Sequence, residues 1–381
     1  MVTHRLRIAI DGRPALWPRT GIGTIAQNVL ATLPDFDNVN QYFAYFNASP
    51  DIEPGYHSNL EARCGGPSHK LAWANTWLPG QLSRDRIDIF ITFLDKELPL
   101  IPTRARIVSM VHDLIPLRFP STVFRNAAHR FYYNVLIRAA AQRADLILTN
   151  SEHSRREIVN GLSVPESKIR KITLGVNVTP SHDRSRVENV LRRHNIRRPY
   201  VLGLGGTEPR KNNARVIEAF RGLASDYPDL QLAIAGSNWR GRVFDSSLLN
   251  DRVRLLGYVS QDDLPIVMQS AEALVFPSLH EGFGFPVIES MALGTPVITS
   301  NVTALPEVAG GAALLVDPNH VGQIAAAIRL MLEDGDLSAD LGRRGRARAA
   351  HFRWDTTCSE LVAACESLIN GHECRREPVT Q

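Results

Sequence analysis

The sequence has little of what would place the chain in a membrane or an oxidising compartment. Only four of its 381 residues are cysteines, and their spacing forms no zinc-binding pairs. We therefore expect no disulfide framework, as is usual in a reducing compartment. No apolar run reaches the roughly 18–20 residues that a membrane-spanning helix needs. Because the first residues also lack the apolar core of a signal peptide, we expect a cytoplasmic location.

Several enzyme classes are excluded in the same way. The sequence contains neither the Gly-x4-Gly-Lys-Ser/Thr motif of P-loop kinases nor the Gly-x-Ser-x-Gly elbow of α/β-hydrolases. No complete Gly-x-Gly-x-x-Gly follows the first predicted strand, which argues against a dehydrogenase. No Asp-x-Asp near a strand end and no histidine cluster with ligand spacing indicates a metal site. We therefore expect no metal, no other cofactor and no nucleic-acid partner.

What is present is the composition of a globular protein with two or more domains, with 44% hydrophobic and 22% charged residues. The charge is uneven along the chain. Residues 1–180 contain 21 Lys and Arg against 15 Asp and Glu, whereas residues 181–381 contain 22 against 24. The basic excess of the first half could face an anionic membrane or a phosphate-bearing molecule, or it could be ordinary solvated surface.

Apolar, β-rich runs alternate with helical patterns, as in parallel α/β sheets. The predicted strands are 6–10, 87–93, 106–111 and 146–149 in the first half, and 200–204, 230–235, 253–256, 273–276, 296–299 and 312–316 in the second. The predicted helices are 22–33, 124–143, 214–224, 322–332, 338–349 and about 356–368. The two halves therefore look like two similar sheets rather than one large one.

The segment from His280 to Glu289 is the most informative in the chain. It follows the predicted strand 273–276 and opens a short helix that Gly294 would end. Glu281 and Glu289 flank a Gly-Phe-Gly turn at the carboxyl end of that strand, where open α/β sheets bind ligands. The two carboxylates could therefore hold separate parts of one polar ligand. The alternative is an exposed surface turn with two solvated acids.

A second polar segment, Gly203 to Asn212, follows the first strand of the second half. Arg210 and Lys211 stand at the mouth of this strand-to-helix turn, where two cations could hold a diphosphate. Fixed cations would also stabilise the charge that grows on a departing nucleoside diphosphate. The alternative is that both cations merely cap a surface loop.

These motifs resemble the donor site of retaining glycosyltransferases of family 4, which have the GT-B fold. The resemblance rests on Glu-x7-Glu around Gly-Phe-Gly, followed by Ala-Leu-Gly-Thr-Pro-Val-Ile, and is most specific over residues 200–300. It implies an α/β chain of two Rossmann-like domains that face a cleft. Residues 1–180 would form the acceptor side and 181–350 the nucleotide-sugar domain, and the helix of 351–381 would cross back to the first domain.

The resemblance also implies roles for single residues. Glu281 would contact the donor sugar and Glu289 the ribose hydroxyls. The backbone of Gly282, Phe283 and Gly284 would face the sugar, and the segment containing Val259 would lie against the base. The family often has Gly-Arg-x4-Lys in the loop after the first strand. Gly206 occupies the position of that Arg here, so Arg210 is expected to take its role beside Lys211.

Two segments of the first half extend the resemblance. Gly21 and Gly23 match a glycine loop that faces the donor and would let the backbone approach phosphate or acceptor closely. An ordinary tight turn is the alternative. His112, at the end of the strand 106–111, matches a histidine that reaches the donor sugar near the reacting centre. The alternative is a buried histidine bonded to Asp113.

The motifs together predict a retaining glycosyltransferase in which the leaving phosphate, and no side-chain base, takes the acceptor proton. The segments 111–116 and 207–212 resemble bacterial O-polysaccharide mannosyl- and rhamnosyltransferases. This favours GDP-mannose, with GDP-rhamnose as the alternative donor, and as acceptor a glycan on polyprenyl diphosphate at the inner face of the cell membrane. A nucleotide-sugar epimerase and a non-catalytic nucleotide-sugar-binding subunit are the alternative functions.

The helical stretch 124–143 bears on the membrane. It carries Arg125, Arg130, Arg138 and Arg143 among aromatic and aliphatic residues, a composition that suits a helix lying on an anionic lipid surface. The alternative is that its apolar side packs on the sheet while the arginines still face outward. We therefore expect peripheral attachment to the membrane through the first domain.

Overall fold

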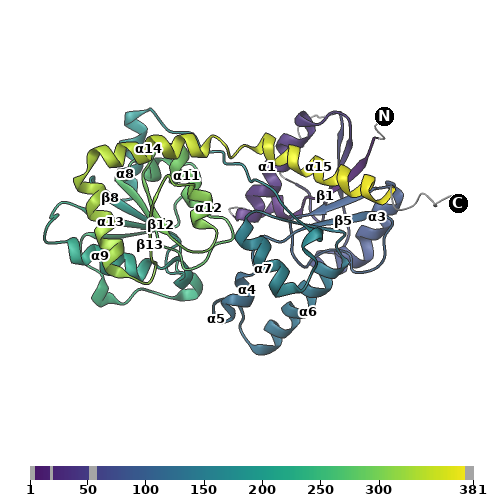
Figure 1. Cartoon of the computed structure of the whole chain (residues 1–381), viewed down its shortest axis with the longest axis horizontal. Helices are drawn as coiled ribbons and strands as arrows, with labels where there is room; N and C mark the ends of the chain where they lie inside the picture. The colour runs from purple at the N-terminus through teal and green to yellow at the C-terminus, as the bar shows by residue number, and fades with distance from the viewer. Residues whose placement is uncertain (1–4, 18–19, 51–57, 374–381) are drawn as a thin grey trace. The chain divides into compact units, whose positions relative to one another are not determined.

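The computed structural model describes residues 5–17, 20–50 and 58–373. The chain divides into two compact units, of which the first joins residues 1–175 to 353–381 and the second comprises 176–352 (Figure 1). The boundaries expected from the sequence lay at 180/181 and 350/351. Within the described ranges, no helix combines the length and the apolar character needed to cross a bilayer.

The first unit is built on a parallel sheet of seven strands in the order β3-β2-β1-β4-β5-β6-β7. The strands are β1 (Arg7–Asp11), β2 (Gln41–Phe46), β3 (Leu60–Cys64), β4 (Ile89–Thr92), β5 (Arg106–Met110), β6 (Leu146–Thr149) and β7 (Ile169–Lys171). Because β1 pairs with both β2 and β4, the chain reverses its direction of winding between β1 and β4. Open α/β sheets bind ligands at such a switch point.

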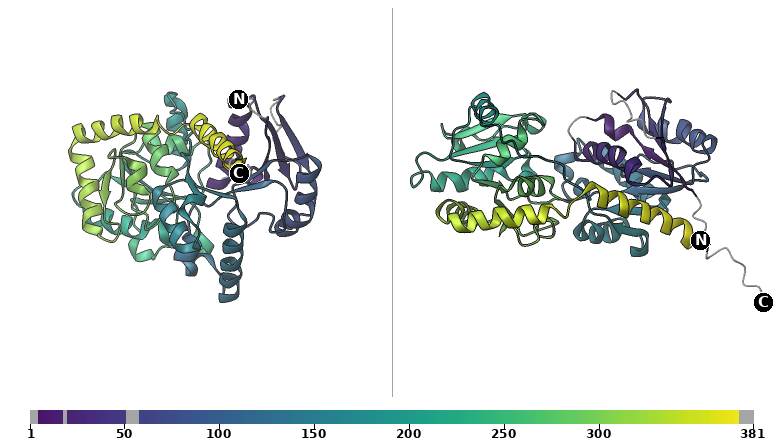
Figure 2. Two further views of the ribbon diagram at one scale, coloured as in Figure 1. Left: turned by 45° about the vertical axis from the view of Figure 1, so that its right-hand side comes forward. Right: turned by 90° about the horizontal axis from the view of Figure 1, so that it is seen from above.

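Helices cover both faces of this sheet (Figures 1 and 2). They are α1 (Gly21–Phe36), α2 (Lys70–Ala72), α3 (Leu78–Arg84), α4 (Ile115–Arg118), α5 (Pro120–Val123), α6 (Ala127–Arg143), α7 (Glu152–Leu162) and α15 (Trp354–Glu373). The last helix packs beside α1, and the Thr357 hydroxyl donates to the Thr173 carbonyl at 2.7 Å. The final helix thus belongs to the first unit.

The second unit has a parallel six-stranded sheet in the order β10-β9-β8-β11-β12-β13. Its strands are β8 (Tyr200–Leu204), β9 (Gln231–Ala235), β10 (Val253–Gly257), β11 (Ala273–Phe276), β12 (Val297–Ser300) and β13 (Leu314–Val316). Its helices are α8 (Arg184–Arg193), α9 (Asn213–Leu223), α10 (Leu264–Gln269), α11 (Phe285–Leu293), α12 (Leu305–Ala309), α13 (Val321–Glu333) and α14 (Gly335–Ala349). The predicted architecture of two Rossmann-like parallel sheets is confirmed.

The core of the second unit shows why its sheet can carry a site at one edge. The helices α9 and α13 pack together over one face, where Phe220, Ile324 and Ile328 are buried against strand residues such as Val275. The other face is covered by α11, and α14 packs against α11. With both faces buried, polar groups gather at the carboxyl ends of the strands.

The helix predicted over 124–143 begins later than expected. Asn126 caps α6 by accepting a hydrogen bond from the His129 amide at 2.8 Å, so the helix starts at Ala127 and Arg125 lies outside it. Asn is a favoured N-cap residue, and the arrangement satisfies one of the amides left unpaired at a helix start. Tyr133 and Ile137 of α6 face the core.

Candidate functional site

The two polar loops predicted from the sequence meet at the switch point of the second sheet. β8 and β11 are neighbours, and the loops 205–212 and 277–284 leave their carboxyl ends. The Leu279 amide donates to the Arg210 carbonyl at 2.8 Å, and the Asn212 side chain donates to the Pro277 carbonyl at 3.0 Å. The loops are therefore fixed to each other by backbone and side-chain hydrogen bonds.

A buried charge cluster lies between these loops. Oε1 of Glu281 is 2.7 Å from Lys211 Nζ, 2.8 Å from Arg210 Nη1 and 2.7 Å from the Ser278 hydroxyl. Arg210 also pairs with Glu208 at 2.8 Å. Only 7% of the Glu281 surface is exposed, so the alternative of an exposed turn with solvated acids does not hold for this residue. The two cations fix it inside the loop.

The electrostatics of this cluster follow from the same contacts. Burial alone would raise the pKa of Glu281, but the charges of Lys211 and Arg210 and the hydrogen bonds from Lys211 and Ser278 outweigh it and lower the pKa to about 2. Glu281 is consequently ionised at neutral pH. Lys211 Nζ also lies 4.8 Å from the centre of the Phe276 ring, which gives the ammonium a favourable aromatic face.

Two glycines explain the shape of the loop after β8. Gly205 has φ +99°, and a Cβ there would come 2.3 Å from Lys211 Cγ, so its missing side chain makes room for Lys211. Gly206 has φ +55°, and a Cβ there would lie 2.2 Å from the Ser237 carbonyl. An arginine cannot occupy position 206 unless this backbone moves. At position 210, by contrast, the guanidinium of Arg210 reaches Glu281 at 2.8 Å.

The helix that follows the second loop begins and ends as predicted. Gly284 is the N-cap of α11 with φ +113°, and Gly294 ends the helix in the left-handed region. Phe283 is buried and meets Phe285 and Phe352 edge to face. It therefore anchors the turn and does not line an open surface, while Gly282 and Gly284 keep the backbone narrow on either side of it.

Glu289 lies in α11, eight residues beyond Glu281, and differs from it in its surroundings. Burial raises the pKa of Glu289 to about 7, and among the described residues no cation offsets the effect. The two carboxylates that the sequence paired therefore have pKa values on opposite sides of the ordinary range. Such a separation is common where two acids serve different roles in one site.

A pocket of about 380 Å³ opens at the carboxyl ends of β8, β9 and β10. Its lining includes Thr207, Ser237, Asn238 and Tyr258. Val259, predicted to lie against a nucleotide base, is buried and is not one of the lining residues; its two predecessors line the pocket. The sequence reasoning missed Ser237 and Asn238, although both come just after a predicted strand.

The two candidates from the first half lie in the first unit. His112 follows β5, and its Nε2 is 3.0 Å from the Phe93 carbonyl. Because a carbonyl only accepts, Nε2 carries the proton. Burial lowers the pKa of His112 more than the Phe93 carbonyl, Asp113 and Asp95 raise it, so the ring is neutral at pH 7.

Gly23 has a local structural role. Its amide donates to the Thr20 hydroxyl at 2.9 Å and so caps α1, and a Cβ at this position would come 2.5 Å from the Trp17 carbonyl. The absence of a side chain is thus explained by the turn itself. The glycines follow β1 in the chain, after the short helix Arg13–Leu16.

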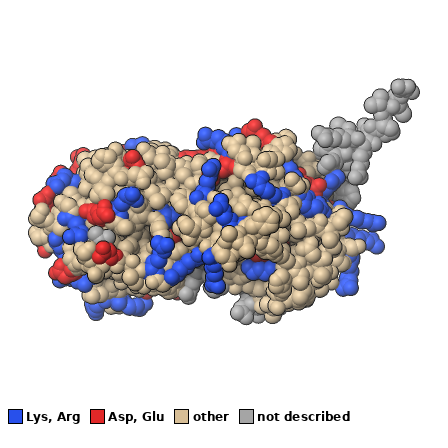
Figure 3. Space-filling view, turned by 90° about the horizontal axis from the view of Figure 1, so that it is seen from below, with Lys and Arg blue, Asp and Glu red and all other residues tan. Residues whose placement is uncertain are grey.

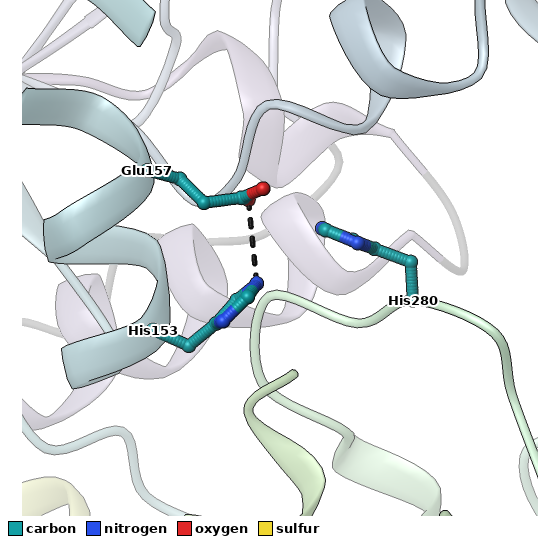
Figure 4. Close-up of side chains that lie close together, drawn as sticks. All are labelled: His153, Glu157 and His280. Atoms are coloured by element: carbon teal, nitrogen blue, oxygen red, sulfur yellow. Dashed lines mark ion pairs between the residues drawn. The ribbon is translucent and has the colours of Figure 1, made fainter. Parts of the chain in front are cut away.

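A cluster on α7 was not predicted. Ser151 caps this helix through the Ser154 amide at 3.0 Å. In the same helix, His153 Nε2 and Glu157 Oε2 lie 3.5 Å apart, and both side chains are drawn in Figure 4. Arg118 Nε donates to Glu157 at 3.0 Å. The His-x3-Glu spacing, which places both side chains on one helix face, is the signal that could have found this pair.

Comparison with known proteins agrees with these observations. Residues 188–348 match the family described as glycosyl transferases group 1, and residues 44–180 match glycosyltransferase family 4. The chain is 32% identical over 275 residues to O-antigen chain mannosyltransferase B of Escherichia coli, an alignment that covers 69% of this chain and 71% of that protein. It is also 28% identical over 389 residues to the serotype-specific mannosyltransferase WbdA of Escherichia coli. That alignment covers 97% of this chain but only 46% of WbdA, so the chain spans less than half of that relative.

A solved structure extends the agreement to the whole fold. Sucrose-phosphate synthase from Thermosynechococcus elongatus superposes with a TM-score of 0.72 over 96% of this chain and 100% of that one. At 19% sequence identity this likeness concerns the fold alone. Together with the sequence matches and the two parallel sheets, it identifies the architecture as GT-B. The chain is a glycosyltransferase and belongs to glycosyltransferase family 4.

Proposed function

We propose that the chain transfers mannose from GDP-mannose to a glycan carried on polyprenyl diphosphate, with retention of the anomeric configuration, in the synthesis of an O-antigen or another cell-surface polysaccharide. The observation that carries the proposal is the buried Glu281 held by Lys211 and Arg210 at the switch point of the second sheet. Support for mannose comes from the two relatives described above, both of which are named as mannosyltransferases.

The diphosphate of the donor is assigned to the cations of the first loop. Arg210 is shared between Glu208 and Glu281, whereas Lys211 forms its ion pair with Glu281. A diphosphate that attracts Lys211 therefore breaks only one ion pair, the one between Lys211 and Glu281. Arg210 remains bound to Glu281 and keeps it in place. As the glycosidic bond breaks, the growing negative charge on the leaving group strengthens its attraction to both.

The remaining parts of the donor are assigned to neighbouring groups. The base would occupy the pocket at the ends of β8, β9 and β10, where Thr207, Ser237 and Asn238 offer hydrogen bonds. An ionised Glu289 would accept hydrogen bonds from the ribose hydroxyls, and Glu281 would meet the sugar. A site of about 380 Å³ is within the range of roughly 300–1,000 Å³ of small-molecule pockets.

No side chain is assigned as the base that removes the acceptor proton. The leaving phosphate would take it on the face from which it departs. His112 suits a positioning role because its Nε2–H is held by the Phe93 carbonyl, which leaves Nδ1 of the neutral ring as a hydrogen-bond acceptor for a sugar hydroxyl. With two fixed cations at the diphosphate, transfer would need no metal ion.

The membrane is proposed as a further partner through α6. Phe131 and Val135 are 72% and 49% exposed, and they share one face of the helix with Arg138. Arg143, by contrast, is directed to Thr103 and Asp145, so it contributes little to an outward basic surface. Figure 3 shows basic side chains scattered over the face it presents, so any attachment would combine a few arginines with the apolar side chains.

The decisive experiment offers labelled GDP-mannose, GDP-rhamnose and UDP-glucose in parallel, each with a membrane lipid extract as acceptor. Transfer of label from GDP-mannose to lipid supports the proposal, and transfer only from GDP-rhamnose would replace the donor. Isomerisation of a nucleotide-sugar without acceptor would identify an epimerase instead. Tight binding of GDP-mannose without any turnover would identify a non-catalytic binding subunit.

A further inference from the structure

We propose that a pocket in the first unit binds one sugar of a neutral acceptor glycan, with Glu97 as its hydrogen-bond acceptor and Tyr132 as its stacking surface. The inference rests on the proposed function for the identity of the glycan. The pocket has a volume of about 400 Å³ and is lined by Ser68, His69, Lys70, Leu71, Lys96 and Glu97, together with Tyr132 and Leu136 of α6.

The pocket lies next to the switch point of the first sheet. β1 and β4 are neighbours there. Arg13 follows β1 in the chain, and Lys96 and Glu97 follow β4. The second sheet carries its charge cluster at the equivalent place, after its first and fourth strands. Each unit therefore brings a cation and a carboxylate together at its own switch point.

Glu97 is held from below by a rigid arginine. The Arg13 guanidinium makes a bidentate pair with Asp11 at 2.8 and 2.7 Å, lies 4.0 Å from the centre of the Trp73 ring, and donates to the Glu97 carbonyl at 3.1 Å. Arg13 is 1% exposed and Glu97 is 7% exposed. The backbone at Glu97 is thus held in place before any ligand arrives.

One oxygen of this carboxylate lacks a close donor. Oε1 lies 3.4 Å from Lys70 Nζ, whereas Oε2 lies 3.8 Å from Arg13 Nη1, beyond hydrogen-bonding distance. Within the part of the chain that the structure describes, no donor reaches Oε2. Oε2 is itself covered by protein atoms, so a ligand hydroxyl in the pocket would donate to Oε1, whose present partner Lys70 is 53% exposed and can move aside for it.

The charges around the pocket favour a sugar over a phosphate. Lys70 pairs with Glu97, and Lys96 pairs with Asp95 at 3.1 Å, so the two lysine charges are matched by two carboxylates. A phosphate would face the Glu97 oxygen, which repels it. A sugar hydroxyl can donate to Glu97 and accept from Lys70, and so satisfies both kinds of group.

The α6 side of the pocket supplies apolar surface. Tyr132 and Leu136 are one turn apart and face the pocket, while the face that carries Phe131 and Val135 points elsewhere. Tyr132 is 51% exposed, and its ring can stack on the C–H face of a sugar ring. Carboxylate, ammonium and aromatic ring thus converge on one small volume.

The test compares acceptor and donor kinetics with soluble α-mannotriose as acceptor and GDP-mannose as donor. Glu97→Gln and Tyr132→Ala should each raise the KM for α-mannotriose by about tenfold, the loss of one good hydrogen bond or stacking contact, and leave the KM for GDP-mannose unchanged. Tyr132→Phe should keep the wild-type KM because it keeps the ring. Phe36→Ala, which removes a 44% exposed aromatic of the same unit from α1, is the matched control and should change neither constant.

A second arm measures binding directly. Saturation-transfer NMR with α-mannotriose and no donor should show contact with wild-type protein and a reduced signal with Tyr132→Ala. Unchanged acceptor KM in both variants, or displacement of the triose by inorganic pyrophosphate, would overturn the sugar assignment even if mannose transfer is intact. If the wild type transfers no mannose yet binds the triose through Tyr132, the proposed function fails and the pocket assignment stands.

Discussion

Replacing Glu281 by Gln tests the central feature of the site. The substitution keeps the size of the side chain and removes the charge that Lys211 and Arg210 share. An amide oxygen can still accept one hydrogen bond, from Ser278 or Lys211, but it no longer compensates two cations. Because these groups are buried, we expect a loss of stability, which an exposed turn would not show.

The size of the effect follows from the pKa of Glu281. The shift from an ordinary value of 4.5 to about 2 corresponds to roughly 3 kcal/mol of interaction that favours the ionised folded form. Removing one partner of a buried ion pair costs a similar amount, about 3–5 kcal/mol. We therefore expect Glu281→Gln to lower the free energy of unfolding of the second unit by about 3 kcal/mol at pH 7.

The pH dependence distinguishes this explanation from a general packing defect. The folded pKa is depressed, so the contribution of Glu281 is fully present above about pH 4.5 and is lost as the pH falls toward 2. The difference between wild type and Glu281→Gln should shrink accordingly between pH 5 and pH 3. Hydrogen exchange of peptides from residues 176–352 in urea measures it for this unit alone. Equal stability at pH 7, or a difference independent of pH, would refute the buried ion pair.

The same variant has a functional consequence. Freed from Glu281, Lys211 and Arg210 should bind GDP at least as tightly as in the wild type, while mannose transfer falls because the contact to the sugar is lost. Calorimetry with GDP and a transfer assay on the same preparation measure the two effects. Weaker GDP binding together with normal transfer would contradict both parts.

Four further predictions follow from the site and the surface. Lys211→Ala should weaken GDP binding by roughly 1.5–3 kcal/mol, as expected for a hydrogen bond to a charged group, whereas Arg210→Ala should chiefly destabilise the fold because it leaves Glu208 and Glu281 without their common partner; calorimetry and urea unfolding separate the two. Burial raises the pKa of Glu289 to about 7, so if only the carboxylate binds ribose, GDP affinity should fall about tenfold from pH 8 to pH 6, and a Glu289→Gln variant should lose this dependence; a pH profile that survives in that variant would assign the titration to another group. Transfer should continue in EDTA, and activity that EDTA abolishes and Mn²⁺ restores would show that the cations do not replace a metal. Finally, the protein should sediment with anionic vesicles at low salt and leave them at high salt, and Phe131→Ser should weaken this binding without changing GDP affinity; equal binding to neutral and anionic vesicles at all salt levels would remove the electrostatic part.

Much of the second unit could be predicted because β8, β9, β11 and β12 are wholly buried and read as apolar runs. β8 and β11 of this unit were predicted to the residue, as was β6 of the first unit. Three strands of the first unit were not predicted, and two of them have weak sequence patterns. β3 is mostly exposed or half-exposed and carries Glu61 and Arg63, and β7 is only three residues long. β2, Gln41–Phe46, is wholly buried and rich in aromatic residues, so its signal was present and overlooked.

The functional site, too, could be predicted only in part. Motif spacing placed Glu281, Arg210 and Lys211 in two loops that do meet. It could not reveal that Glu281 is paired with both cations, because side-chain pairing depends on how two loops far apart in sequence fold onto each other. It also gave no sign of Glu97, whose burial is set by Arg13, a residue 84 positions earlier.

The steric clash at position 206 is another feature that the sequence alone could not explain. The family pattern led us to expect an arginine function near Gly206, and sequence alone could only note its absence. The backbone supplies the reason, since the left-handed conformation and the Ser237 carbonyl leave no space for a Cβ there. The placement of Arg210 beside Glu281 then becomes a geometric compensation that can be tested by mutation.

The return of α15 to the first unit has a consequence for the order of folding. Thr357 bonds to Thr173, 184 residues earlier, and Leu361, Ala364 and Cys365 of the same helix are buried. During synthesis the second unit, a continuous segment, is complete before α15 has been made. The first unit must therefore hold its unfinished surface beside α1 open to water while the ribosome adds the whole of its neighbour. Such a delay exposes apolar surface to aggregation and makes this unit the slower one to mature.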